Sequence, residues 1–371
     1  MSTPWLRLDV LPAGFGDALL LRYGSGRDRH TVLVDAGPAE ESSWTPVSAA
    51  LRALTDPIDL FVVTHIDVDH IGAAVTLLGD PALSKRVRAV WFNGFRHLER
   101  AGDWLGGIDG ELLTTAIRSL GVPWNAGFEH PIDASVGGPV LVPPTGRLPR
   151  VPLPGGATAI LLSPTPKKLA ALKKSWRKTV EDAGLVPGQG AHREPGRRLV
   201  GDDWLGDVDL ARLAARPTRV DGKAPNGSSI AFVFEWGKRR LLLGADAHPD
   251  VVAAGLARLA AEDGTPKVRV DAVKLPHHGS SANLTAAVVD AIDCRDWIVS
   301  SNGARFNHPD DVALARVVVG SPAARLHANY DSDRIRAWRA LAPPERHGYE
   351  LVTPPDGQSG VGLSFGPVPT L

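Results

Sequence analysis

Four side chains that can bind a metal ion lie within six residues, directly after an apolar segment. The segment, residues 60–63, has the composition of a short strand buried on both faces, and His65, Asp67, Asp69 and His70 follow it. Imidazole and carboxylate groups in such a turn can converge on one point, and this combination suits zinc, manganese or iron. The alternative is structural, because the two carboxylates could cap the next helix while the histidines fill polar gaps.

An acidic residue ends a second apolar segment. Asp246 comes shortly after residues 241–243, behind Gly244, and precedes His248. A lone carboxylate at such a point is as often a helix N-cap as a metal ligand. Asp246 is therefore a candidate ligand only in combination with the first cluster.

Two later strand ends carry further histidines. His277 and His278 follow the predicted strand 272–275, and adjacent side chains point in different directions. We therefore expect one of them to bind metal and the other to contact substrate. The next predicted strand, 297–300, is followed by four polar residues: Asn302, Arg305, Asn307 and His308. Because α/β proteins place their sites where strands become loops, the four groups together predict one site.

Composition and charge exclude several classes of protein. The chain of 371 residues carries 41 Lys and Arg against 41 Asp and Glu, so no net field draws the whole molecule to nucleic acid or anionic lipid. Cys294 is the only cysteine, which excludes an intramolecular disulfide and a thiolate zinc cluster. No apolar run approaches the length of a spanning helix, about 18 residues, and the first residues lack a secretory pattern. We expect a cytoplasmic protein without a membrane partner.

The elements that must position these residues alternate between strand and helix. Short β-rich segments predict strands, and longer periodic segments predict helices. The expected strands are 6–11, 18–23, 31–34, 60–63, 87–92, 159–162, 229–235, 240–243, 272–275 and 297–300. The expected helices are 44–54, 111–120, 251–261, 284–291 and 311–318, with loops and short strands over 136–158. Both halves combine hairpins with α/β units, which predicts two packed sheets with helices outside.

A basic segment interrupts this alternation. Residues 166–178 predict an amphipathic helix whose narrow apolar stripe consists of Leu169, Leu172 and Trp176. Lysine and arginine cover most of the remaining surface, so the segment could dock nucleic acid; a solvated helix face is the simpler alternative. The whole of 165–225 is predicted to be a flexible insertion, because Pro, Gly and paired arginines are frequent in it.

The order of these motifs resembles that of the metallo-β-lactamase superfamily, from about residue 5 to about residue 315. The motifs are Asp17, Asp35-Ala-Gly, His65-x-Asp-x-Asp-His-x-Gly, Asn226-Gly-Ser-Ser, Leu-Gly-Ala-Asp246, Lys274-Leu-Pro-His-His-Gly-Ser and Asn307-His-Pro. Within the superfamily the chain looks most like the hydrolase domain of ComEC-type competence proteins and its free-standing soluble relatives. The resemblance implies an α/β fold, an αββα four-layer sandwich formed by residues 1–325. It would carry 165–225 as an insertion, 326–371 as a C-terminal extension, and one or two metal ions at the sheet edges.

The resemblance also implies a role for each residue. The metal ligands would be His65, Asp67, Asp69, His70, Asp246 and His278, with the aspartate of the fifth motif bridging two ions. Asp69 would also orient the attacking water, His277 would contact a substrate oxygen, and His308 would donate a proton or act as an alternative ligand. The substrate-binding residues would be Lys274, Ser280, Asn302, Arg305 and Asn307. Asp17 and Asp35 would support the ligands, with Asp35 holding a ligand histidine.

Two departures from the superfamily pattern concern the metal ions. The pattern is His-x-His-x-Asp-His, and Asp67 stands in place of its second histidine, so the site favours manganese, magnesium or iron more than an all-histidine site would. A further histidine is usual before Asp246, where this chain offers only His97, His130 and His192. His97, which follows a strand, is the best of the three. One metal position is therefore expected to be weak or empty.

Together these features predict a metal-dependent hydrolase that uses metal-activated water. The resemblance, the basic segment 166–178, Lys274, Arg305 and the hydroxyls of Ser280 and Ser281 favour a phosphodiesterase or nuclease working with zinc or manganese. An ester or lactone hydrolase of the same fold, which needs an apolar acyl pocket, is one alternative. A non-catalytic binding module with a degenerate metal site is the other.

Overall fold

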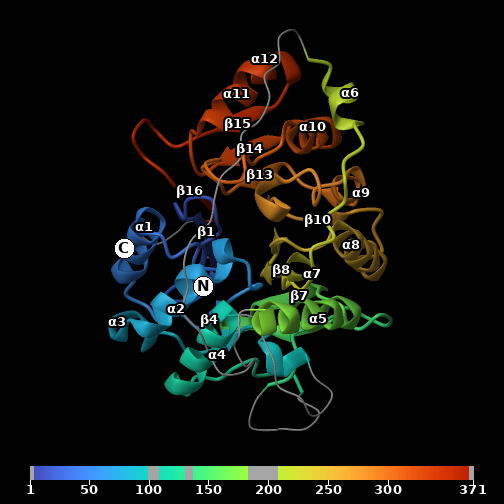
Figure 1. Ribbon diagram of the computed structural model, residues 1–371. Helices are drawn as coiled ribbons and strands as arrows, with labels where there is room; N and C mark the ends of the chain where they lie inside the picture. The colour runs from blue at the N-terminus through green and yellow to red at the C-terminus, as the bar shows by residue number, and fades with distance from the viewer. Residues whose placement is uncertain (1–3, 99–107, 130–136, 183–207, 367–371) are drawn as a thin grey trace.

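The computed structural model describes residues 4–98, 108–129, 137–182 and 208–366 (Figure 1). Two mixed β-sheets form its centre, and the first of them has six strands. Their order is β16 (Val361–Phe365), β1 (Pro4–Val10), β2 (Leu19–Ser25), β3 (Asp28–Val34), β4 (Leu60–Val62) and β5 (Val90–Trp91). The strands from β16 to β3 pair antiparallel, whereas β3, β4 and β5 run parallel.

The second sheet has eight strands and the larger parallel part. Their order is β15 (Glu350–Val352), β14 (Arg325–Ala328), β13 (Asp296–Val299), β11 (Ala272–Lys274), β9 (Arg239–Leu243), β8 (Ala231–Trp236), β7 (Thr158–Ser163) and β6 (Arg150–Pro152). The five strands from β15 to β9 are parallel, so their carboxyl ends meet at one edge. A separate parallel pair consists of β10 (Val268–Arg269) and β12 (Ile292–Asp293).

The main hydrophobic core lies between the two sheets. Leu6 and Leu8 of β1 alternate with more polar residues, so they share one face of their strand. They belong to the same buried cluster as Ile160 of β7 and Phe232 of β8. Because one cluster contains residues from both sheets, the sheets pack face to face.

Helices cover the outer face of each sheet. The six-stranded sheet carries α1 (Glu41–Ala53), α2 (Val68–Gly79), α3 (Pro81–Ser84) and α4 (Ile108–Leu120), whose apolar residues form a second buried cluster with it. The eight-stranded sheet carries α8 (Pro249–Asp263), α9 (Ala286–Asp290), α10 (Asp311–Gly320) and α11 (Asp333–Leu341). Figure 1 shows α1 and α3 on the opposite flank from α8 and α9. The predicted αββα four-layer sandwich is confirmed.

The C-terminal residues belong to the same sandwich as far as residue 366. β14 and β15 extend the eight-stranded sheet, with α12 (Pro344–His347) between α11 and β15, and β16 closes the edge of the six-stranded sheet beside β1. Trp338 of α11 is completely buried in the main core. The described part of the segment 326–371, which was expected as an extension of the domain, therefore adds strands to both sheets.

The expected insertion begins with a helix that packs on the body of the protein. Helix α5 (Pro166–Asp182) carries the predicted apolar stripe, and Leu169, Leu172 and Trp176 are all buried. The ring of Trp176 packs edge-on against Phe95, at 5.9 Å between centroids. Two short helices follow, α6 (Leu210–Ala214) and α7 (Ala224–Gly227). No helix in the described ranges combines the length and apolar character needed to cross a membrane.

Candidate metal centre

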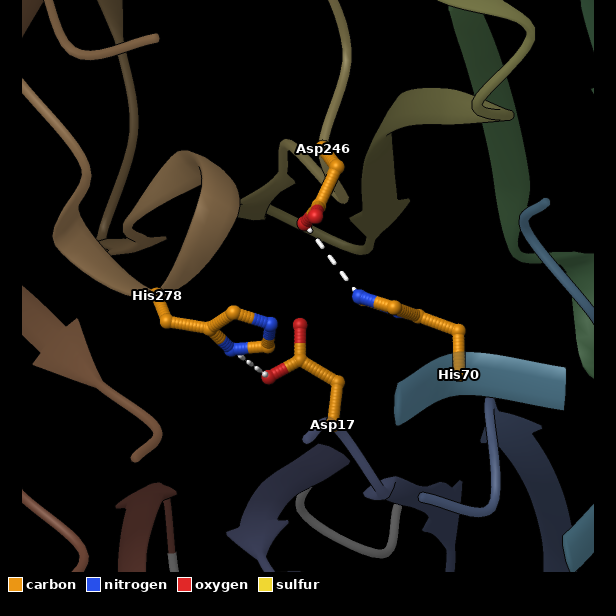
Figure 2. Close-up of side chains that lie close together, drawn as sticks. All are labelled: Asp17, His70, Asp246 and His278. Carbon is orange, nitrogen blue, oxygen red and sulfur yellow. Dashed lines mark ion pairs between the residues drawn. The ribbon is translucent and has the colours of Figure 1, made fainter. Parts of the chain in front are cut away.

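Four elements bring ligand-type side chains to one point at the strand ends. His70 lies in the first turn of α2, Asp17 in the loop between β1 and β2, and Asp246 in the loop between β9 and α8. His278 lies in η3 (Pro276–Gly279), a short turn after β11. Figure 2 shows these four side chains pointing toward one another, and their ligand atoms lie within 4.8 Å of one another. All four residues are buried.

Neither Asp67 nor Asp246 caps a helix, which was the structural alternative to metal binding. Asp67 occupies the N-cap position of α2 but makes no side-chain capping hydrogen bond. The N-cap of α8 is His248, so Asp246 does not cap that helix. Both carboxylates are therefore available to other partners in the site.

The buried ligand atoms lack ordinary partners. Within the described ranges no hydrogen bond reaches Nε2 of His70 or His278, or Oδ1 of Asp17 or Asp246. Looser ion pairs of 3.3 Å join His70 Nε2 to Asp246 Oδ1 and His278 Nδ1 to Asp17 Oδ1. Leaving buried polar atoms without hydrogen bonds costs about 1–3 kcal/mol each. A divalent cation among these atoms would satisfy all four, so the residues present fit a metal ion.

Two histidines are held so that Nε2 remains available. Nδ1 of His70 donates to Asp35 Oδ2 at 2.7 Å, and Thr64 donates its N–H and its hydroxyl to the same carboxylate at 2.8 Å. Nδ1 of His278 donates to the carbonyl oxygen of Ser300 at 2.9 Å. Such contacts fix the tautomer and the ring orientation of a metal-binding histidine. Asp35 thus orients His70, one of the candidate ligands.

Asp17 and Lys274 lie in places that the sequence did not indicate. Asp17, expected behind the ligands, contributes an atom to the buried cluster itself. Lys274, expected to bind substrate, is buried, and its ammonium contacts Asp17 Oδ2 at 2.7 Å and donates to the Leu275 carbonyl at 3.0 Å. Burial would raise the pKa of Asp17, but Lys274 and then His278 outweigh it and lower the pKa. In this structure Lys274 keeps Asp17 charged instead of facing a ligand.

Asp69 lies against the same cluster from the first turn of α2. Its Oδ2 is 3.3 Å from His278 Nε2, and its carbonyl accepts a hydrogen bond from the Asp17 N–H at 3.1 Å. Burial would raise the pKa of Asp69, but the contact with His278 and the charge of His70 lower it to about 2. Asp69 is therefore an ionised carboxylate beside the buried cluster.

A second group of ligand-type side chains surrounds the other oxygen of Asp246. Oδ2 of Asp246 lies 3.4 Å from His277 Nε2 and 3.9 Å from His65 Nε2. Asp67 Oδ2 lies 4.0 Å from the same nitrogen of His65, and the Asp67 side chain is 34% exposed. We call this the open group, and we call the group of Asp17, Asp69, His70 and His278 the buried group. Asp246 belongs to both.

Charges in the open group are crowded. Burial, followed by the charges of Asp69 and Asp246, raises the pKa of Asp67 to about 7. Burial and the neighbouring His70 lower the pKa of His65 to about 3, so its ring is neutral. A neutral imidazole and a crowded carboxylate are both suited to a cation.

The backbone around the two adjacent histidines is strained. His277, His278 and Gly279 have φ of +49°, +54° and +87°, and the first two carry side chains in a region that glycine favours. The His277 N–H donates to the Ala245 carbonyl at 2.8 Å, which joins this turn to the loop of Asp246. A Cβ on Gly279 would lie 2.7 Å from Pro309 Cβ. In this turn His277 Nε2 lies 3.4 Å from Asp246 Oδ2, and Figure 2 shows the His278 ring beside Asp17 within the buried cluster.

Three polar residues that the sequence analysis did not assign support His277. Its Nδ1 donates to Asn283 Oδ1 at 2.7 Å and lies 3.6 Å from Asp221 Oδ2. Asp221 accepts hydrogen bonds from Asn283 at 3.0 Å and Asn226 at 2.6 Å. Asn226 begins one of the sequence motifs, whereas Asp221 lies in the expected insertion and no local pattern marks it. These residues orient His277 with Nε2 toward Asp246.

A buried arginine fastens this part of the insertion to the site. Arg316 of α10 is 7% exposed and donates to the carbonyl oxygens of Ser281, Leu284, Arg216 and Ala214 at 2.8–3.2 Å. The first two carbonyls follow η3, and the other two precede Asp221. Arg316 therefore ties the supporting segment to the turn that carries His277.

Of the other predicted residues, Ser280 follows η3, whereas His308 and Arg305 follow β13. Nδ1 of His308 donates to Asp310 Oδ1 at 3.0 Å, and its ring is 5.5 Å from that of His277. Burial lowers the pKa of His308, and Asp310 opposes this effect. Ser280 is buried within its turn. Arg305 is partly exposed and pairs with Glu40 at 3.6 Å.

Three further residues complete the predicted set. Asn302 is partly buried and its side-chain oxygen accepts from the Ala304 N–H, whereas Asn307 is exposed. His97, the best of the extra histidine candidates, packs edge-on against Trp124 at 4.6 Å and is not part of the buried cluster. His130 and His192 lie outside the described residues. No extra histidine among those described joins the site from this region, and His277 lies beside Asp246 Oδ2 instead.

Comparisons with known proteins give similarity in structure only. No family model and no curated protein matches the chain. A mutant of the CmlA beta-hydroxylase is 14% identical with a TM-score of 0.39, over 96% of this chain and 54% of that chain. The metallo-beta-lactamase fold protein YhfI from Bacillus subtilis is 9% identical with a TM-score of 0.39, and the match covers 98% of this chain and 99% of that chain. This chain spans about half the length of the CmlA beta-hydroxylase chain.

Proposed function

We propose that the chain is a metal-dependent hydrolase of the metallo-β-lactamase superfamily that cleaves phosphodiesters. One observation supports metal binding most directly. Buried ligand atoms of Asp17, His70, Asp246 and His278 lie within 4.8 Å of one another, and hydrogen bonds do not satisfy them. The order of the sequence motifs and their convergence at the strand ends of a two-sheet sandwich support the superfamily.

The two groups around Asp246 would hold up to two ions. His70, His278, Asp69 and Asp17 would bind one with Asp246 Oδ1, and His65, Asp67 and His277 would bind the other with Oδ2. Histidine mixed with carboxylate suits manganese or zinc, and also iron or magnesium where carboxylates dominate. When bound, such an ion supplies Lewis acidity and lowers the pKa of water to near 7.

The protein's own groups would position substrate and move protons. Asp69, ionised and beside His278, would accept a hydrogen bond from the attacking water and orient it. His277, held by Asn283, would direct Nε2 toward a substrate oxygen or an ion. His308 would give a proton to the leaving oxygen, and burial makes the protonated ring a readier donor.

A cation at the rim supports the phosphodiester as substrate. Arg305 is partly exposed, follows the same strand as His308, and has a planar guanidinium suited to phosphate oxygens. Helix α5 adds Lys173 and Lys174, which are half-buried and exposed, as a proposed contact for longer nucleic acids. An acyl substrate would not need these cations.

Hydrolysis of bis-p-nitrophenyl phosphate tests the proposal. We expect activity that requires added manganese or zinc and is lost in Asp246→Asn, a nearly isosteric variant that should keep its melting temperature. p-Nitrophenyl acetate and a lactone are assayed in parallel. Metal-dependent cleavage of these substrates alone would replace the phosphodiesterase by an acyl hydrolase. A protein that binds neither metal would be a non-catalytic module.

A further inference from the structure

An aromatic and cationic platform lies at the outer end of the site. Phe306 is among the few large apolar side chains left exposed in the described ranges, at 42%. Its ring is 6.4 Å from that of His308, which is 5.5 Å from that of His277. Because His277 Nε2 is 3.4 Å from Asp246 Oδ2, a short series of contacts joins Phe306 to the candidate metal centre.

Phe15 and Arg305 both contact Phe306. The rings of Phe15 and Phe306 pack edge-on, at 5.7 Å and 81°. The Arg305 guanidinium carbon lies 4.8 Å from the Phe15 centroid and 5.5 Å from that of Phe306. Phe15 is buried and lies two residues from Asp17, so the platform of Phe15, Arg305 and Phe306 bridges two loops of the site.

Backbone hydrogen bonds set the shape of the loop that carries Phe306. The Asn302 N–H donates to the Gly14 carbonyl at 2.9 Å, and the Ala304 N–H donates to Asn302 Oδ1 at 2.9 Å. Gly303 and Asn307 turn the chain with φ of +74° and +57°. These contacts therefore fix the loop in a conformation that leaves the Phe306 ring exposed. Exposing this apolar surface to water is unfavourable.

We propose that Phe306 determines substrate specificity by stacking on an unpaired nucleobase of the phosphodiester, while Arg305 contacts a neighbouring phosphate. The phosphodiester part of this inference rests on the proposed function. Every base has a π-face, so an exposed ring binds bases with little sequence preference, and arginine beside it adds attraction for the backbone. The favoured substrate is single-stranded nucleic acid, because bases in a duplex are already stacked and paired.

Two fluorescent oligonucleotides of equal length test this inference, one of deoxythymidine and one with the same backbone but abasic throughout. Both binding, by anisotropy, and cleavage by the manganese-loaded protein are measured. We expect the wild type to prefer the base-bearing strand by about tenfold. The preference should fall toward unity in Phe306→Ala and persist in Phe306→Trp. Val319→Ala, at a comparably exposed apolar site on α10, is the matched control.

Equal binding of both strands by the wild type, or a preference that survives in Phe306→Ala, would overturn the inference. So would tighter binding of a duplex than of its single strand. If neither strand nor bis-p-nitrophenyl phosphate is cleaved, the phosphodiesterase proposal fails. The anisotropy ratio still decides the role of Phe306 in that case, so the two failures are distinguishable.

Discussion

The buried group and the open group lie on either side of Asp246 and are held differently. In the buried group, His70 and His278 have fully buried side chains, and each ring is fixed by a strong contact at Nδ1, to Asp35 or to the Ser300 carbonyl. In the open group, Asp67 is 34% exposed and His277 is 15% exposed. The support for His277 comes from Asn283 and from the expected insertion.

We interpret this difference as a division between metal retention and catalysis within one site. A closed set of preoriented ligands favours retention of an ion, since little has to move when it binds. In the open group His65 is fully buried, but Asp67 and His277 are partly exposed, and the His277 ring lies 5.5 Å from that of His308. We infer that the buried group contributes most of the metal affinity, and that the open group determines the choice of metal and, through His277, contributes to turnover.

Removal of the shared residue should have the largest effect. Asp246 contributes an oxygen to each group, so Asp246→Ala should weaken metal binding by more than about 100-fold, beyond the range for supporting residues. Elemental analysis after manganese loading measures this, and circular dichroism checks the fold. Full metal content in a folded variant would show that Asp246 joins neither group.

Substituting one residue that supports a histidine in each group compares the two groups directly. Asp35→Asn weakens the hold on His70 and should lower metal affinity by roughly 10–100-fold. Asp221→Asn acts on His277 and should lower kcat while leaving the metal affinity of the buried group nearly unchanged. Titration calorimetry and steady-state kinetics on both variants give the result. Equal losses of affinity in the two variants would abolish the distinction between the groups.

A change within the open group should alter metal preference. Asp67→His replaces an oxygen donor by nitrogen and should shift activity from manganese toward zinc by several-fold. The ratio of rates with the two metals is the measurement, and Asp28→His, at the exposed start of β3, is a control. An unchanged ratio would remove Asp67 from the ligands.

The smallest effect concerns α5, outside both groups. If nucleic acid crosses this helix, Lys173→Ser with Lys174→Ser should lower the salt slope of single-strand binding by about 1.4, because each phosphate that a lysine neutralises adds about 0.7 to that slope. Hydrolysis of a small phosphodiester should not change. Arg177 and Lys178, also expected to contribute, have side chains outside the described residues. An unchanged slope would assign the helix face to solvent.

The local part of the site could be predicted from the sequence. His65 to His70 follow an apolar strand, and Asp246 and His278 follow two others, so strand ends alone place them together. The two-sheet sandwich followed from the alternation of strands and helices. The C-terminal segment was harder to place, because β14, β15 and β16 are short and reach their partners only through the tertiary fold.

The remainder depends on pairs that are distant in sequence. Lys274 and Asp17 are 257 residues apart, and nothing near either residue indicates that they form a buried ion pair. Asp221 reaches Asn283 across 62 residues, with Arg316 fastening the intervening segment. Phe306 resembles any other loop aromatic until Phe15 and His308 are placed beside it. Such contacts depend on the packing of whole elements.

Diffraction from crystals grown with manganese tests the central claim most directly. An anomalous difference map should show a peak about 2.0–2.3 Å from His70 Nε2, His278 Nε2 and Asp246 Oδ1. A weaker peak near Asp246 Oδ2 would mark the open group. No peak among the buried ligands, in crystals where the protein is folded as described, would contradict the metal centre and with it the proposed hydrolase.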